Sequence, residues 1–428
     1  MERLVINGGK KLKGKLAVPT AKNAVLPIIA ASIMLDGESH INACPKLSDI
    51  KVSCEIIEQT GSTAVMQNGR LSVFYNESER CEIPENLCSA MRSSILYLAP
   101  LLYRKGKAVL SLPGGCNIGA RPVDIHLEGL EQMGAEINCE NDKLVVTAPQ
   151  GLNGTNFKLR LPSVGATETL IMAAVTANGL TILKNCAREP EIVDLARFLN
   201  LAGAKITGAG KGEIIIQGVQ SLNAVEYTPI PDRIFAATVL SAVNACKGLC
   251  VLTNYPQEYM EEFERLLAQT GLSVIHYVDN ALVFKYSEKP ADIMAHTGYY
   301  PAFSTDMGPL LASSMVNNEG SLNLYESIFE KRFSYMPEFR KLGLFCIENG
   351  REYYQKNKDS ITAAQLAAKD LRAGAALVVA ALAKNGSYTV SGVEFIDRGY
   401  EDIEKTFSLL GADIRRISVE TEKNVTTE

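Results

Sequence analysis

The stretch YEDIEKTFSLLGADIR, residues 400–415, joins an amphipathic helical run to a glycine and then to a strand-like run. The same pattern occurs five more times, around QTGSTAV, QMGAEIN, LAGAKIT, QTGLSVI and KLGLFCI. A glycine at the end of an amphipathic helix is typical of a left-handed C-cap. The pattern recurs every 68 to 73 residues, which is longer than a solenoid repeat, and its glycines are Gly61, Gly134, Gly203, Gly271, Gly343 and Gly411.

Each repeat also contains a second helical run that is apolar on nearly all faces, which predicts a buried helix. These runs are KNAVLPIIAASIML, RSSILYLAPLLY, TETLIMAAVTA, RIFAATVLSAV, DMGPLLASSMV and RAGAALVVAALA. Their alternation with strand-like runs predicts six βαβαββ units that pack helices inside and sheets outside. Three units per domain give two domains of ordinary size, with a break near EYTPIPDRI, residues 226–234.

The composition predicts a soluble globular protein with a large core, because 46% of its 428 residues are apolar. The longest apolar runs, residues 24–35 and 373–383, are shorter than the ~20 residues of a membrane span. No apolar run of signal-peptide length opens the sequence, so we expect a cytoplasmic protein with reduced cysteines. A net charge of −5 argues against non-specific nucleic-acid binding.

The starts of the six apolar helices carry polar or charged residues. Each one alone is explained as a cap or a solvated helix end. Their coincidence in six repeats instead favours two opposed faces of helix N-termini, where backbone N–H groups and helix dipoles bind anions. The sequence thus predicts a phosphate-binding cleft, and these residues are Lys22, Arg92, Thr167, Arg233, Asp306 and Arg372.

The stretch SLPGGCNIGARPVDIH, residues 111–126, predicts a glycine-rich lid that leads into a helix beginning near Pro122 or Val123. Its Cys116 is either a small apolar turn residue or a reactive thiol, and the surrounding glycines favour the second interpretation. Neighbouring arginines favour a thiolate, whereas a proton donor requires the thiol, so both protonation states stay open.

Other motifs carry less chemistry. TGAGKGE, residues 207–213, lacks phosphate-loop spacing and lies between strand-like runs, which predicts a hairpin turn. No pair of cysteines or histidines has the spacing of a zinc site. Of the four histidines, only His126 follows Cys116 closely enough to be near a site.

Ten stretches in order carry a resemblance that covers nearly the whole chain. They are AKNAVLP (21–27), MRSS (91–94), SLPGGCNIGARPVDIH (111–126), SVGAT (163–167), AREPEIVD (187–194), PDRI (231–234), STDM (304–307), FEKRF (329–333), DLRAGAAL (370–377) and IDRGYE (396–401). They resemble the UDP-N-acetylglucosamine 1-carboxyvinyltransferase family of enolpyruvyl transferases, in the EPSP synthase-like superfamily.

The resemblance implies an α/β fold of two inside-out α/β barrel domains, each with three βαβαββ units in pseudo-threefold symmetry. We expect a first domain over residues 22–230 that carries the catalytic loop 111–122, and a second over 1–21 plus 231–428. The implied reaction moves the enolpyruvyl group of phosphoenolpyruvate to the 3′-hydroxyl of UDP-N-acetylglucosamine and releases phosphate, early in peptidoglycan synthesis. No metal or other cofactor is implied, and the partners are these two small molecules.

The resemblance also assigns roles. Cys116 resembles the general acid that can form an adduct with phosphoenolpyruvate, and Asp306 resembles the base that faces the sugar hydroxyl. The cations that bind phosphoenolpyruvate in the family are matched here by Lys22, Arg121 and Arg398. Arg372 is a further substrate-site residue at the start of its helix. The UDP-sugar site corresponds to Asn23, Arg92, Arg121, Pro122, Val123, Asp124, Ile125, Ser163, Val164, Gly165, Asp306 and Ile328.

Three positions depart from the family pattern: Ser48, Ser304 and Gly308 stand where lysine, proline and glutamine are expected. Two alternatives to the main prediction are a 3-phosphoshikimate 1-carboxyvinyltransferase and a catalytically silent paralogue that binds UDP-sugar. The stretch SAMRSS differs from the GNAGT type expected of the first. Retention of both an acid and a base argues against the second.

Overall fold

The sheets follow a single plan in the computed structural model, which describes residues 2–111, 123–141, 143–278 and 281–418. Within these residues there are six four-stranded sheets. In each sheet the first strand runs parallel to the second, and the other two strands pair antiparallel. The predicted βαβαββ unit is thus confirmed in all six repeats.

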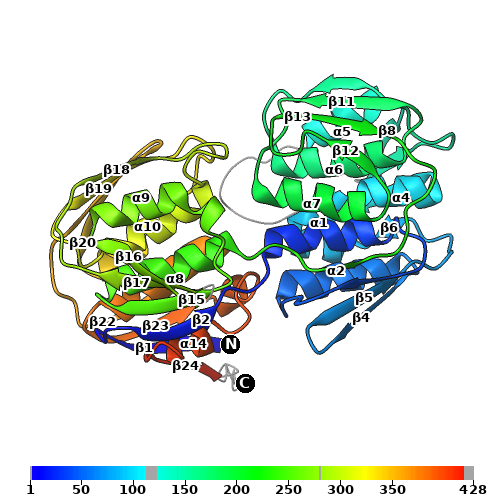
Figure 1. Cartoon of the computed structure of the whole chain (residues 1–428). Coiled ribbons are helices and arrows are strands. Elements are labelled where there is room, and N and C mark those ends of the chain that lie inside the picture. Colours follow the sequence, from blue (N-terminus) through cyan, green and yellow to red (C-terminus); the bar gives the residue numbers. More distant parts are fainter. Residues whose placement is uncertain (1, 112–122, 142, 279–280, 419–428) are drawn as a thin grey trace, which may run out of the picture.

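The first three units form one lobe (Figure 1). Unit one contains β14 (Glu226–Tyr227), α1 (Lys22–Ser32), β3 (Glu38–Ile41), α2 (Ser48–Gln59), β4 (Thr63–Gln67) and β5 (Arg70–Phe74). Unit two contains β6 (Glu82–Ile83), α3 (Glu85–Ala90), η1 (Arg92–Tyr97), α4 (Leu98–Lys105), β7 (Lys107–Ser111), α5 (Asp124–Gln132), β8 (Glu136–Glu140) and β9 (Lys143–Thr147). Unit three contains β10 (Asn156–Lys158), α6 (Val164–Val175), β11 (Leu180–Lys184), α7 (Pro190–Leu201), β12 (Lys205–Thr207) and β13 (Glu213–Gln217).

The last three units form the other lobe. Unit four contains β2 (Lys13–Ala17), α8 (Arg233–Ala245), β15 (Leu249–Thr253), η2 (Gln257–Tyr259), α9 (Glu261–Gln269), β16 (Leu272–Val278) and β17 (Ala281–Tyr286). Unit five contains β18 (Ile293–His296), η3 (Thr305–Met307), α10 (Gly308–Ser314), β19 (Ser321–Tyr325), α11 (Met336–Lys341), β20 (Leu344–Asn349) and β21 (Glu352–Asn357). Unit six contains β22 (Ala363–Ala367), α12 (Leu371–Ala383), β23 (Gly386–Ser391), α13 (Val393–Ile396), α14 (Ile403–Ser408), β24 (Asp413–Ser418) and β1 (Glu2–Gly8).

Each lobe is an inside-out barrel, because the helices lie in the middle and the sheets cover them (Figure 1). The central helices of the second domain, α8, α10 and α12, contact one another pairwise. Every residue of α12 except Leu371 is buried, as a helix that is apolar on all faces requires. Two separate apolar cores result, and the predicted fold class is confirmed.

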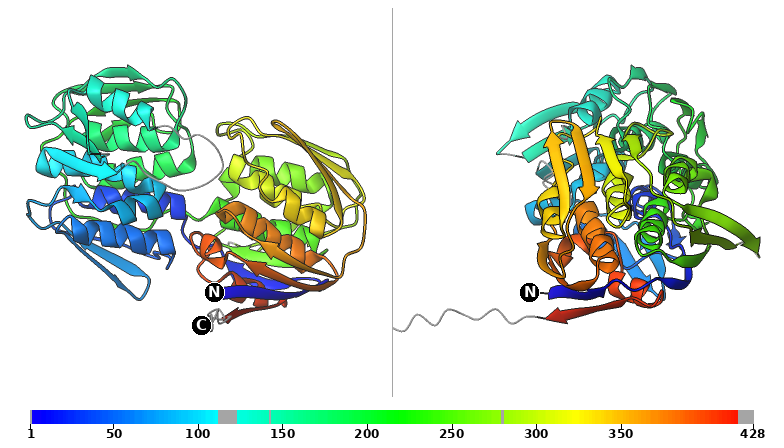
Figure 2. Two further views of the ribbon diagram at one scale, coloured as in Figure 1. Left: turned by 180° about the vertical axis from the view of Figure 1, so that it is seen from behind. Right: turned by 90° about the vertical axis from the view of Figure 1, so that its left-hand side faces the viewer.

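The chain crosses between the lobes twice. Strands β1 and β2 belong to the second domain, although they come first in the sequence, and β1 pairs with the last strand, β24 (Figure 2). Strand β14 pairs with β3 and completes unit one before α8 begins the second domain. The first core extends from Val25 to Leu222. The exact boundaries, 22–230 and 1–21 plus 231–428, stay a proposal.

The repeated glycines do what their pattern predicts. All six have positive φ, between 84° and 108°. Residues 207–213 link β12 to β13 as the predicted hairpin, in which three glycines have φ of 84°. The helix that carries Thr167, however, begins earlier than its apolar run, at Val164 with Ser163 as N-cap. Thr167 therefore lies inside the first turn of α6, where its hydroxyl donates to the Ser163 carbonyl.

No helix in the described part of the chain is both long and apolar enough to cross a membrane. The nine cysteines within the described residues are free thiols.

Candidate active site

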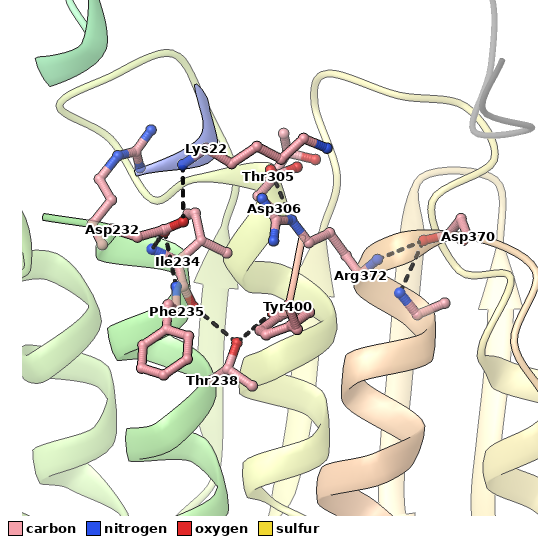
Figure 3. A network of polar contacts seen from close by, with 12 residues as sticks. Lys22, Asp232, Ile234, Phe235, Thr238, Thr305, Asp306, Asp370, Arg372 and Tyr400 are labelled. Carbon is pink, nitrogen blue, oxygen red and sulfur yellow. Dashed lines mark hydrogen bonds and ion pairs between the residues drawn. The ribbon is translucent and has the colours of Figure 1, made fainter. Parts of the chain in front are cut away.

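The inner helices of the second domain present their N-termini side by side (Figure 3). Asp232 caps α8 by accepting from the amides of Ile234 and Phe235, and Asp370 caps α12 in the same way. The backbone amide of Lys22 also donates to Asp232, over 3.4 Å, so the start of α1 joins this group from the first domain. The gathering of helix starts predicted from the repeats is therefore present in this domain.

Asp306 lies between two arginines. Arg332 Nη2 donates to Asp306 Oδ1 at 2.6 Å, and Arg372 Nε donates to Asp306 Oδ2 at 3.0 Å. The arginine side chains are 3% and 6% exposed, whereas that of Asp306 is 25% exposed. The carboxylate is therefore held by two buried cations, while its own side chain stays partly exposed.

The charge of Arg372 is secured by this contact. Burial alone would lower the pKa of Arg372, but Asp306, together with Tyr400 and Asp232, outweighs burial and raises that pKa above its ordinary value. Ile328 lies close in the hydrogen-bond network, because its amide donates to Glu326, which accepts from Thr305 beside Asp306. Asp306, Arg372 and Ile328 are thus brought together.

A second carboxylate, Asp49, joins Lys22 to Arg398. Lys22 Nζ lies 2.6 Å from Asp49 Oδ2, and Arg398 donates to both carboxylate oxygens at 2.8 and 3.3 Å. Lys22 and Asp49 belong to the first domain and Arg398 to the second. Two of the three predicted phosphoenolpyruvate cations therefore meet across the domain boundary.

Burial and charge act in opposite directions in this group. Burial, together with the charges of Arg398 and Arg372, lowers the pKa of Lys22 and outweighs the opposing effect of Asp49. Burial would raise the pKa of Asp49, but Lys22 and Arg398 together bring it below its ordinary value. Asp49 is thus an ionised carboxylate that holds two cations.

The first domain brings together a third group. His126 on α5 shares a hydrogen bond of 2.9 Å with Thr169 on α6, and a Cβ added at Gly165 would lie 3.2 Å from its ring. Burial, with the charge of Arg92, lowers the pKa of His126 to about 4. His126 is therefore a neutral packing residue beside the site rather than a proton carrier at neutral pH.

The same helix starts hold the predicted UDP-sugar residues. Val123 precedes α5, Asp124 pairs with Arg160, and Ser163 caps α6 ahead of Val164 and Gly165. Arg92 begins η1, and Asn23 lies in the first turn of α1. Among the described residues, Lys22 and Arg398 are joined through Asp49. No contact among these residues joins Arg92 or Ser163 to Asp306. The predictions for Cys116, Arg121 and Pro122 lie outside the described residues.

Sequence reasoning missed several charged residues of these networks, among them Asp49, Arg332 and Glu326. Asp49 ends PKLSD, a stretch singled out only for Ser48, and Arg332 lies inside FEKRF. The available signal was that each is charged and lies in or near a stretch already singled out. The paired residues are distant in sequence, since Arg398 lies 349 positions after Asp49.

The three departures from the family pattern flank these carboxylates. Ser48 begins α2 next to Asp49, and its amide donates to the carbonyl of Asp397 at 3.2 Å. Ser304 precedes η3, and Gly308 begins α10, two residues after Asp306. A Cβ at Gly308 would lie 3.3 Å from Leu324, which leaves little room for a larger side chain without adjustment.

Two other features lie apart from this site. Within the described residues, no group of three or more His, Cys, Asp or Glu side chains could hold a metal ion. A pocket of about 520 Å³ beside the second chain crossing is lined by Arg197, Pro231, Tyr255 and Tyr259 among others. It contains none of the described residues predicted for the site.

Relatives match nearly the full chain. The family model for EPSP synthase (3-phosphoshikimate 1-carboxyvinyltransferase) matches residues 6–407. UDP-N-acetylglucosamine 1-carboxyvinyltransferase 2 of Caldanaerobacter subterraneus subsp. tengcongensis is 42% identical over 97% of this chain and 100% of its own. UDP-N-acetylglucosamine 1-carboxyvinyltransferase 1 of Clostridium perfringens is 40% identical over 97% of this chain and 100% of its own.

Solved structures share the architecture. The enolpyruvyl transferase NikO from Streptomyces tendae has a TM-score of 0.87 at 25% identity, over 98% of this chain and 99% of its own. EPSP synthase from Acinetobacter baumannii has a TM-score of 0.74 at 18% identity, over 98% of this chain and 100% of its own. The second likeness shows the fold alone.

Proposed function

The chain belongs to the EPSP synthase family and, within it, to the UDP-N-acetylglucosamine 1-carboxyvinyltransferases, and from this we propose how its residues share the work of the reaction. The enzyme transfers the enolpyruvyl group of phosphoenolpyruvate to the 3′-hydroxyl of UDP-N-acetylglucosamine and releases phosphate. This is the first committed step of peptidoglycan precursor synthesis. We propose that it acts in the cytoplasm.

The observation that carries the site assignment is the meeting of Lys22 and Arg398 on Asp49. Phosphoenolpyruvate carries a carboxylate and a phosphate, and both need cations in a site of low dielectric constant. An arginine can pair with either group through two parallel hydrogen bonds, and a lysine adds a compact charge. Lys22 and Arg398, with Arg121, bind these groups, and Asp49 holds Lys22 and Arg398 in place.

Asp306 acts as the base for the sugar hydroxyl. Its carboxylate is partly exposed, while Arg332 and Arg372 fix its orientation. As Asp306 takes the proton, the sugar oxygen attacks C2 of phosphoenolpyruvate, and Cys116 delivers a proton to C3. Loss of a C3 proton and of phosphate from the tetrahedral adduct then restores the enol double bond.

The UDP-sugar binds mainly to the first domain. The starts of α5, α6 and η1 present backbone amides and the cation Arg92, which suit a diphosphate. Val123, Asp124 and Ile125 contribute from α5, and the Ser163–Gly165 segment contributes from α6. Asn23, Arg121, Pro122 and Ile328 complete the proposed contacts with the nucleotide sugar.

Phosphate release tests the function directly. We expect release only when UDP-N-acetylglucosamine and phosphoenolpyruvate are both present. Turnover with shikimate 3-phosphate in place of the sugar nucleotide would instead identify the sister activity. Tight binding of the sugar nucleotide without any turnover would identify a silent paralogue.

The thiol has its own test. An epoxide mimic of phosphoenolpyruvate should alkylate Cys116, and faster once UDP-N-acetylglucosamine is bound. Peptide mass mapping identifies the modified cysteine, and Cys139, which is exposed, is the internal control. Modification of Cys139 while Cys116 stays unmodified would contradict the role of Cys116.

A further inference from the structure

Arg416 on β24 directs its guanidinium at three carboxylates from three other segments. It pairs with Asp397 through two hydrogen bonds of 2.8 Å, from Nη1 to Oδ2 and from Nη2 to Oδ1. Nε and Nη2 also donate to Glu404 at 3.0 and 3.1 Å, and Nη1 donates to Glu2 at 2.9 Å. These five hydrogen bonds equal the donor capacity of an arginine.

The position of this cluster gives it significance. Asp397, which receives the paired hydrogen bonds, directly precedes Arg398 in the sequence. The Asp397 carbonyl also accepts from the Ser48 amide of the first domain, one residue before Asp49. The corner that contains Asp397 is therefore tied on one side to β24, α14 and β1, and on the other to the start of α2.

This hydrogen-bonded ion-pair network differs from an ordinary surface ion pair. An isolated exposed pair adds little, because it loses side-chain entropy and is screened by salt. Here the Arg416 side chain is 20% exposed, the Glu404 side chain 13%, and the planar fork fixes both direction and distance. Such a network fixes the path of the backbone that carries Arg398.

We propose that Arg416 is a positioning residue for the enolpyruvyl transfer, which acts through Asp397 to hold Arg398 where phosphoenolpyruvate binds. Arg416 need not touch either substrate. The inference rests on the proposed function, and specifically on the role of Arg398 in binding phosphoenolpyruvate. The effect of Arg416 should therefore appear in the kinetics of that substrate and depend on the presence of Arg398.

The first experiment compares Arg416→Ala with Arg415→Ala, since Arg415 is an exposed arginine on the same strand. Phosphate release is measured while phosphoenolpyruvate is varied, and then while UDP-N-acetylglucosamine is varied. We expect kcat/KM for phosphoenolpyruvate to fall on the order of 100-fold in R416A, the usual scale for a misplaced substrate contact. KM for the sugar nucleotide should stay within about twofold of wild type, as should all constants of R415A.

The second experiment is a double-mutant cycle with Arg398→Lys, which keeps a charge at the site. If Arg416 works through Arg398, adding R416A to R398K should lower kcat/KM for phosphoenolpyruvate by less than about threefold, because the two losses are shared. Should R416A fail to fold, Arg416→Lys takes its place in the cycle. A lysine keeps the charge but cannot form the paired hydrogen bonds, so we expect about a tenfold loss.

Three outcomes would overturn the inference. One is wild-type kinetics for phosphoenolpyruvate in R416A. Another is an equal loss from R416A in the wild-type and R398K backgrounds, which would mean that Arg416 acts independently of Arg398. The third is an equal loss for both substrates, which a general loss of structure predicts. Absence of phosphate release by the wild-type enzyme would overturn the proposed function itself, and is seen before any variant is made.

Discussion

Asp49 and Asp306 are two carboxylates in similar positions, because each lies at the beginning of a helical segment and each accepts hydrogen bonds from two cationic side chains. They differ in exposure and in the origin of their partners. The Asp49 side chain is 5% exposed, and its partners come from both domains. The Asp306 side chain is 25% exposed, and Arg332 and Arg372 both belong to the second domain.

The difference in exposure decides what each carboxylate can do. A buried carboxylate with two cations has no room for a further partner, and removing it would leave those cations uncompensated. A partly exposed carboxylate with fixed neighbours can be reached by a substrate hydroxyl. The same arrangement of charges thus suits Asp49 to positioning and Asp306 to proton transfer.

The largest effect is expected from Asp306→Asn, which removes the base but keeps the size of the side chain. We expect kcat to fall about 10³-fold, within the range that general acid–base catalysis contributes. Phosphate release at saturating substrates measures the loss. Glu326→Gln is the control, since it changes a carboxylate in the same network without facing the proposed substrate. A kcat within tenfold of wild type for D306N would assign the proton to another group.

Asp49→Asn should lower kcat/KM for phosphoenolpyruvate on the order of 100-fold, because Lys22 and Arg398 lose the charge that orients them. It should also move the alkaline limb of the pH profile to lower pH. Asp49 opposes the lowering of the Lys22 pKa by burial and by the neighbouring Arg398 and Arg372, so without that charge Lys22 loses its proton earlier. The pH dependence of kcat/KM measures this shift.

Glu55→Gln on the same helix is the control for D49N, because Glu55 forms only a loose surface pair with Lys51 at 4.0 Å. It should leave both rate and pH profile unchanged. An alkaline limb in D49N that coincides with that of the wild type would show that Lys22 does not need Asp49 to stay protonated.

His126 offers a third case, a buried histidine whose protonated form would lie beside the cation Arg92. Its pKa falls from 6.5 to about 4 on folding, so the unfolded chain binds the proton more readily between these values. Stability is complete above pH 6.5 and is lost as the pH falls. At pH 5 the wild type should have lost roughly 2 kcal/mol relative to His126→Gln.

Urea unfolding at pH 7 and pH 5 measures this loss for His126. His296→Gln, at an exposed histidine, is the control. If wild type and H126Q lose the same free energy of unfolding between these pH values, then His126 is not kept neutral by its surroundings.

The smallest effect compares the repeated caps. Gly271 and Gly411 occupy the same place in their units. A Cβ at Gly271 would lie 1.8 Å from the Ser287 carbonyl oxygen, whereas a Cβ at Gly411 would have no heavy atom of the described residues within 4 Å beyond its own neighbours. Gly411→Ala should thus cost about 1 kcal/mol, from the backbone conformation alone. Gly271→Ala should lower the free energy of unfolding by clearly more. Thermal unfolding of both variants measures the difference. Equal losses would show that the chain near Ser287 gives way freely.

Local patterns predicted the repeat, the glycine caps and most helix starts, because a helix and its cap are encoded within a few residues. Lys22, Arg233 and Arg372 could be placed in this way. The partners of Lys22 could not, because Asp49 and Arg398 meet only after both domains have folded and docked. Thr167 was placed at a helix start because its apolar run begins there, while the Ser163 cap lies one turn earlier.

Strands β1 and β2 are made before all other described elements, yet their partners are made much later. Strand β2 waits for β15, and β1 waits for β23 and β24 at the far end of the chain. At about 5 to 20 residues per second, synthesis of the intervening chain takes on the order of 20 to 80 s. During that time two strands with unpaired edges precede a first domain that can already close through β14. Translation order therefore leaves β1 and β2 with edges that can pair with another chain until their own partners are made.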